Sequence, residues 1–128
     1  MKALLDTHVL LWWLDHPDRF SRETLAFIRD GRNELLWSAV GTVELAIKAR
    51  RGTLKVKGTL DSFVNDRRAE MGFDHLPVEH RHALAVADLP RLHGDPFDRL
   101  LVAQAKVEGV PLVTSDTLLR KYGIEVIW

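Results

Sequence analysis

The sequence predicts an α/β fold with three layers, in which a central parallel sheet of four to five strands lies between helices. Short apolar runs alternate with amphipathic helical patterns along all 128 residues. Strand–helix–strand connections are nearly always right-handed, so this alternation places helices on both faces of a parallel sheet. No internal repeat or linker-like stretch interrupts the pattern, and a chain of this length can bury a core without disulfides. We therefore expect residues 1–128 to form a single domain.

The strands are expected where short apolar runs are bounded by polar residues. Four such runs stand out, and a fifth run is weaker. The four runs are residues 3–5, 34–37, 111–114 and 124–127, and the weaker run is residues 73–76.

Helices are expected in the segments between these runs, where apolar residues recur at helical spacing. Asp95 and Pro96 are typical of a helix start, with Asp95 as the cap and Pro96 at the first helical position. The expected helices are residues 7–14, 21–30, 40–50, 60–71, 79–87 and 96–108.

The overall charge is not that of a typical nucleic-acid-binding protein. Lysine and arginine total 18, as do aspartate and glutamate, so the formal net charge is zero. One stretch is locally basic and would form either a cationic rim around an acidic site or a solvated helix end and loop. This stretch contains Lys48, Arg50, Arg51, Lys55 and Lys57.

The absence of cysteine limits the kinds of metal site and nucleophile that the protein can have. Disulfides, zinc–thiolate sites, iron–sulfur clusters and thiol nucleophiles are excluded, so any metal must bind to oxygen or imidazole. The amino terminus turns acidic at Asp6 and has neither a secretory apolar region with a cleavage site nor a membrane span. We therefore expect a cytoplasmic protein.

Four carboxylates are placed where a parallel α/β sheet binds its ligands, outside the carboxyl ends of the strands. Asp6 ends the first strand, and Asp116 follows the strand at residues 111–114. Asp98 begins the helix that precedes that strand, and Glu44 lies on the helix after the strand at residues 34–37. The sequence thus predicts an acidic cluster at this edge.

Each acid also has a purely structural explanation. Three of the acids are at expected helix N-cap positions: Asp6, Asp95 and Asp116. Asp98 would interact favourably with the dipole of the helix that it begins. Glu44 is harder to explain in this way because it interrupts a nearly uncharged run. A glutamate on so apolar a helix should be partly buried, and its burial then calls for a cation or a raised pKa.

A cluster of these acids would repel itself unless it were neutralised, and the sequence shows no matched basic partner for each acid. Magnesium or manganese would neutralise it, because hard cations prefer carboxylate oxygens. A metal ion bound in this way would favour metal-assisted hydrolysis of a phosphodiester. Asp6 and Asp98 are then expected as direct ligands, Asp116 as a ligand or a water-bridged acid, and Glu44 as the group that positions or deprotonates the attacking water.

These motifs resemble the PIN domain, and most of all the VapC-type toxins of prokaryotic toxin–antitoxin pairs. The resemblance runs essentially from end to end. It rests on the segments Leu4-Leu5-Asp6-Thr7-His8, the isolated Glu44, residues 95–105 beginning Asp95-Pro96-Phe97-Asp98, and Val113-Thr114-Ser115-Asp116.

The resemblance implies a magnesium- or manganese-dependent endoribonuclease that acts on RNA. It also implies inhibition by a cognate antitoxin protein whose tail covers the site, and usually a homodimer. The family's acidic quartet corresponds to Asp6, Glu44, Asp98 and Asp116. Thr7 and Ser115 match hydroxyl positions near the metal, and Asp95 would cap the helix or join the metal's outer shell.

The histidines and tryptophans give less information about the functional site than the acids do. No histidine pair has the spacing of a helical metal site, and only His8 is close enough in sequence to Asp6 to touch substrate or solvent there. Trp12 and Trp13 would be either core or part of an interface with a partner. Trp37 and Trp128 are expected as core or as cover for the sheet edge.

Other functions share some of these features. A receiver-type signalling domain usually has paired acids after its first strand and a lysine after its last, and a haloacid-dehalogenase-type phosphatase needs an aspartate where His8 stands. A PIN nuclease of RNA maturation or decay, or a domain that only binds a partner through Trp12 and Trp13, remains an alternative. An antitoxin gene immediately upstream would favour the toxin.

Overall fold

The computed structural model describes residues 1–128 and contains one five-stranded sheet in the order β3-β2-β1-β4-β5, with every pairing parallel. The predicted fold class is confirmed, and the weakest predicted strand, residues 73–76, is a true edge strand. The two strands on the other side of β1 are shorter than predicted, because only two residues of each pair with a neighbour. The strands are β1 (Lys2–Leu5), β2 (Glu34–Ser38), β3 (Asp74–Leu76), β4 (Leu112–Val113) and β5 (Val126–Ile127).

All six predicted helices are present, and the bounds of α4 and α6 are those predicted. The expected helix at residues 79–87 is instead a short α-helix that tightens into a 3₁₀ turn. Two further 3₁₀ segments, at residues 17–19 and 117–122, were not predicted. No helix combines the length and the apolar character needed to cross a membrane. The α-helices are α1 (Thr7–Asp15), α2 (Arg22–Arg29), α3 (Ala39–Arg50), α4 (Leu60–Met71), α5 (His80–Ala85) and α6 (Pro96–Glu108), and the 3₁₀ segments are η1 (Pro17–Arg19), η2 (Val86–Asp88) and η3 (Thr117–Tyr122).

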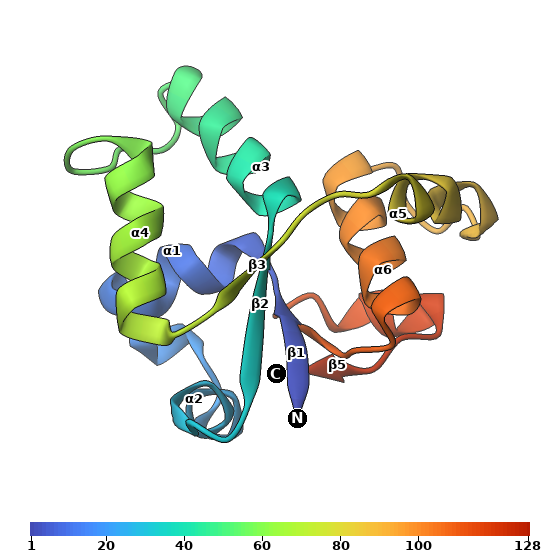
Figure 1. Ribbon diagram of the computed structural model, residues 1–128, viewed down its shortest axis with the longest axis horizontal. Helices are drawn as coiled ribbons and strands as arrows, with labels where there is room; N and C mark the ends of the chain where they lie inside the picture. Colours follow the sequence, from blue (N-terminus) through green and yellow to red (C-terminus); the bar gives the residue numbers. More distant parts are fainter.

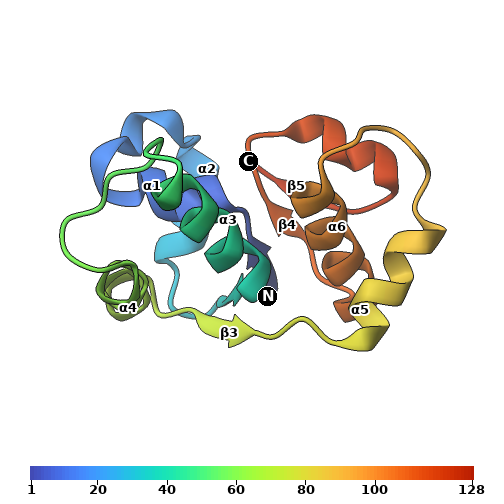
Figure 2. The same cartoon turned by 90° about the horizontal axis from the view of Figure 1, so that it is seen from above.

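The helices cover both faces of the sheet and enclose two hydrophobic cores. In Figures 1 and 2, α1 to α4 gather on one side of the central strands, and α5 and α6 lie on the other. Successive strand residues point to opposite faces. Accordingly Leu5 and Val113 belong to the core under the first group of helices, whereas Leu4 and Leu112 belong to the core under α6.

The strand order places the switch point at β1. The chain passes from β1 outward through β2 to β3, and then returns to the other side of β1 to form β4 and β5. Leu5, the last residue of β1, is paired with Trp37 of β2 and Val113 of β4. The residues that follow these three positions therefore emerge at the same edge, which is where an open parallel sheet binds ligands.

The tryptophans are mainly packing residues. Trp37 is 1% exposed, and its ring lies so close to Gly41 of α3 that any Cβ at this position would collide with it. Trp12 and Trp13 are half-buried against the first core. Trp12 makes an edge contact with Trp128 at 6.0 Å between ring centroids, so Trp128 covers the core beside β5, as predicted.

Candidate active site

Asp6 directly follows β1 and is nearly buried, with 7% of the residue exposed. It stands at the N-cap position of α1, but its side chain makes no capping hydrogen bond. Its Oδ2 instead accepts a hydrogen bond of 2.8 Å from the Thr114 hydroxyl, which comes from the segment after β4. Capping therefore does not account for Asp6, whose carboxylate is held between two strands.

His8 lies beside this carboxylate, with its Nδ1 3.7 Å from Asp6 Oδ2. The polar contact with Asp6 raises the pKa of His8, and partial burial opposes the rise. His8 is thus a partly exposed imidazole beside Asp6 at the edge of the site, and its raised pKa favours the protonated form.

Glu44 is on α3 with 15% of its side chain exposed, so the predicted partial burial is confirmed. Its carboxylate accepts a hydrogen bond of 2.8 Å from the Thr7 hydroxyl on α1. Lys48, one helical turn further along α3, lies 3.3 Å from the other carboxylate oxygen. Glu44 is therefore oriented from two sides.

Asp98 is in the first turn of α6 with 27% of its side chain exposed, and His93 Nε2 lies 3.4 Å from its Oδ2. Burial raises the pKa of Asp98 to about 6, and the negative charges of Asp95, Asp6 and Glu44 raise it further, against the opposing effect of His93. The fold has therefore brought acids from three distant parts of the chain near enough for their charges to act on Asp98.

The capping explanation holds for the two remaining acids. Asp95 accepts hydrogen bonds from the backbone N–H groups of Phe97 and Asp98, at 2.9 and 3.3 Å, and so caps α6 as predicted. Asp116 caps η3 through Leu118 N at 3.2 Å.

Asp116 is nevertheless connected to the acidic cluster through Thr114. The Asp116 N–H donates to the Thr114 hydroxyl at 3.1 Å, and this hydroxyl donates to Asp6. Ser115 is exposed and makes no side-chain hydrogen bond. Asp6 and Glu44 thus lie near enough to Asp98 for their charges to act on it, and Asp116 is linked to Asp6 through Thr114.

The expectation that the acids lack basic partners holds for Asp116 and is wrong for the other three. Lys48 lies beside Glu44, His8 beside Asp6 and His93 beside Asp98. The spacing of Glu44 and Lys48, four residues apart on a helix, could have revealed the first pair. Nothing local in the sequence pointed to His93 or gave Thr114 a role, because both act across the tertiary structure.

The donor chemistry of the cluster suits a hard cation that keeps much of its water. The three converging acids offer only oxygen, and the raised pKa of Asp98 marks repulsion that a cation would relieve. No group of three histidine, aspartate or glutamate side chains is arranged so that it could hold a metal ion on its own. Magnesium typically uses one or two carboxylates and several waters, so the residues present fit such an ion.

The fold and the site define a three-layer α/β protein with a carboxylate cluster at the switch point of its parallel sheet. The family model of the PIN domain matches residues 3–125, and the chain belongs to this family. This assignment displaces the receiver-type and phosphatase alternatives.

Two relatives come from Mycobacterium tuberculosis (strain ATCC 25618 / H37Rv). Ribonuclease VapC22 is 32% identical over 120 residues, which cover 94% of this chain and 91% of that protein. Ribonuclease VapC16 is 40% identical over 60 residues, which cover 47% of this chain and 43% of that protein. The similarity to VapC22 thus extends over nearly the whole chain.

Solved structures share the fold. The crystal structure of VapBC2 from Rickettsia felis, bound to a DNA fragment from its promoter, has a TM-score of 0.76 at 16% identity and covers 99% of this chain and 98% of that chain. The structure of VapBC-1 from nontypeable Haemophilus influenzae has a TM-score of 0.67 at 13% identity, with coverages of 99% and 97%. At these identities the likeness concerns the fold.

Proposed function

We propose that this protein is a metal-dependent endoribonuclease that hydrolyses RNA phosphodiester bonds, and that it is the toxin of a type II toxin–antitoxin module. The observation that carries the proposal is the placement of Asp6, Glu44 and Asp98 at the carboxyl edge of the sheet, where burial and then the charges of the neighbouring acids raise the pKa of Asp98 to about 6. The relationship to ribonuclease VapC22 over 94% of the chain supports the choice of RNA.

Asp6 and Asp98 are the proposed direct ligands of a magnesium or manganese ion. When bound, the ion would polarise the attacking water and stabilise the charge that develops on the phosphate. Asp116, at the border of the cluster, would join as a ligand or through a bridging water. Thr114 orients Asp6 by its hydrogen bond of 2.8 Å, as the outer partners of metal ligands generally do.

Glu44 is the proposed group that positions and deprotonates the attacking water. The Thr7 hydroxyl and Lys48 hold its two carboxylate oxygens, so its direction is set before substrate arrives. A base held in one orientation lowers the entropic cost of reaching the transition state.

The partner would be an antitoxin protein, and the toxin would form a homodimer. Support for the antitoxin comes from two of the similar solved structures, which are of VapBC2 and VapBC-1, whereas the homodimer is proposed from the family resemblance alone. Co-expression with any small protein encoded immediately upstream tests this part: a stable complex that inhibits cleavage is expected. A PIN nuclease of RNA maturation or decay would show cleavage without such an inhibitor.

The nuclease is tested by cleavage of an end-labelled pool of structured RNA, with magnesium, with manganese and with EDTA. Asp6→Asn and Asp98→Asn should abolish metal-dependent cleavage. Asp66→Asn is the matched control, because Asp66 is an exposed residue on α4 without a side-chain partner. Cleavage that persists in EDTA, or in both site variants, would contradict the proposal.

A further inference from the structure

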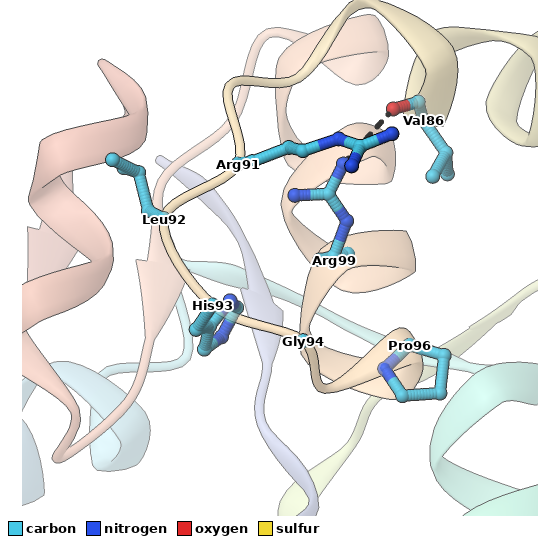
Figure 3. A pocket seen from close by; sticks show the side chains of 7 residues that line it. All are labelled: Val86, Arg91, Leu92, His93, Gly94, Pro96 and Arg99. Atoms are coloured by element: carbon cyan, nitrogen blue, oxygen red, sulfur yellow. Dashed lines mark hydrogen bonds between the residues drawn. The ribbon is translucent and has the colours of Figure 1, made fainter.

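We propose that the pocket beside the amino terminus of α6 binds a backbone phosphate of the RNA, next to the one that is cleaved. The pocket has a volume of about 590 Å³ and is lined on its polar side by Arg91, His93 and Arg99 (Figure 3). This inference rests on the proposed ribonuclease function and adds to it a subsite that recognises phosphate.

The pocket is cationic and has no internal counter-charge. None of its lining residues is an aspartate or glutamate, and neither Arg91 nor Arg99 takes part in an ion pair. The chain as a whole has equal numbers of acidic and basic residues, so this local excess is not a consequence of composition. A multiply charged anion is the ligand that would compensate it.

Arg99 is oriented by neutral groups. Its Nη1 donates to the carbonyl of Pro90 at 2.8 Å, and its Nη2 lies 3.4 Å from the carbonyl of Val86. Its Nη1 also lies 3.4 Å from the Tyr122 hydroxyl. These contacts fix the direction of the guanidinium group, but carbonyls and a hydroxyl do not cancel its charge. The positive charge is thus preorganised at the pocket wall.

Arg91, unlike Arg99, is not held in one orientation by other groups. It is exposed and makes no hydrogen bond or ion pair with the rest of the chain. Figure 3 shows its side chain extending over the same pocket as Arg99. Two guanidinium groups at one pocket repel each other when it is empty, and a phosphate with several acceptor oxygens would relieve this repulsion and accept forked hydrogen bonds from both.

The pocket shares a wall with the proposed catalytic cluster. His93 lines the pocket, and its Nε2 is 3.4 Å from Asp98 Oδ2. Its Nδ1 is fixed by the Tyr122 hydroxyl at 2.6 Å. A polyanion whose scissile phosphate reaches Asp98 therefore continues past His93 into the pocket.

RNA is favoured over an acidic protein segment because of this position. The acids of the cluster repel a phosphate backbone, and Lys48 is already paired with Glu44. A nearby site with uncompensated positive charge would offset the repulsion and align the strand without reading its bases.

The test is the binding of a short fluorescein-labelled single-stranded RNA, followed by fluorescence anisotropy in EDTA at several salt concentrations. The variants are Arg91→Ala and Arg91→Glu. Arg22→Ala is the matched control, because Arg22 is an exposed residue without an ion pair on α2, which lies at the opposite end of the strands in Figure 1. Arg99 is left unchanged, since its carbonyl contacts make it part of the fold.

Arg91→Ala should weaken RNA binding by roughly threefold to tenfold. It should also reduce the slope of log affinity against log salt by about 0.7, the value for one lost phosphate contact on a single strand. Arg91→Glu should weaken binding further, and Arg22→Ala should behave like the parent. Thermal unfolding of each variant checks that the fold is intact.

Three results would overturn the inference. If Arg91→Ala binds RNA like Arg22→Ala while the parent still cleaves RNA, the subsite is wrong and the ribonuclease stands. If a hexaglutamate peptide binds and depends on Arg91 while RNA does not, the pocket recognises an acidic protein segment. If the parent neither binds nor cleaves RNA, both proposals fail together.

Discussion

Replacing Asp98 with asparagine should stabilise the metal-free protein at neutral pH while it removes cleavage. Asp98 has a pKa raised from 3.8 to about 6, mainly by burial and then by the charges of Asp95, Asp6 and Glu44. Between these two pH values the folded protein holds a proton that the unfolded chain has released. The contribution of Asp98 to stability therefore falls as the pH rises through this interval, and the full penalty remains above about pH 6.

The expected gain in unfolding free energy follows from the size of this pKa shift. Each pH unit corresponds to about 1.4 kcal/mol, so the span from 3.8 to about 6 sets an upper bound of about 3 kcal/mol. Solvent reaches 27% of the Asp98 side chain, and this screening reduces the expected gain in unfolding free energy to about 1–2 kcal/mol. Most of the gain should disappear by about pH 4, where the wild-type carboxyl group is protonated in the folded state.

Urea unfolding of the parent and of Asp98→Asn in EDTA, at about pH 7.5 and about pH 4, measures this difference. Asp66→Asn is the control for the loss of an exposed charge and should change stability little at either pH. Magnesium should then stabilise the parent more than Asp98→Asn, because the variant lacks the charge that the ion neutralises. Equal effects of Asp98→Asn at the two pH values would refute the argument that repulsion and burial of this carboxylate oppose folding.

Three further outcomes are expected. Gly41→Ala should lower the unfolding free energy by about 1–3 kcal/mol, because the new methyl group would collide with the Trp37 ring; an unchanged urea midpoint would contradict the packing. Thr114→Val removes the hydrogen bond to Asp6 and should reduce magnesium affinity, measured by calorimetry, by about tenfold to a hundredfold while the far-ultraviolet circular dichroism is retained. Asp6→Asn should lower the pKa of His8, since the carboxylate is the main cause of its rise; an unshifted imidazole titration by NMR would count against that contact.

Helices could be predicted from the sequence where their capping residues and apolar spacing lie within or directly beside the helix itself. The helices α4 and α6 have the predicted bounds because their first and last turns have clear caps: Thr59 and Gly72 flank α4, and Asp95 and Gly109 flank α6. The segment η3 was missed because a six-residue 3₁₀ turn buries only Leu119 and Tyr122, too few for a helical period.

The four acids were identified from their place after strands and on helices, but their individual environments were not. Asp6 and Asp116 look alike in sequence, each following a strand and preceding a helical turn. In the structure Asp116 caps its turn, whereas Asp6 does not and accepts a hydrogen bond from Thr114 instead. Which acid caps and which faces the cluster depends on the neighbouring strand.

The sequence by itself determined the alternation of strands and helices, because that pattern depends on residues close to one another in the chain. It also predicted which acids form the site, from their positions after strands and on helices. Only the tertiary structure decided which groups meet. Thr114 and Asp6 are 108 residues apart and Lys48 pairs with a buried Glu44, while His93 joins Asp98 to a pocket of two arginines. These contacts exist because β1 lies between β2 and β4, and this strand order is a property of the whole core rather than of any segment.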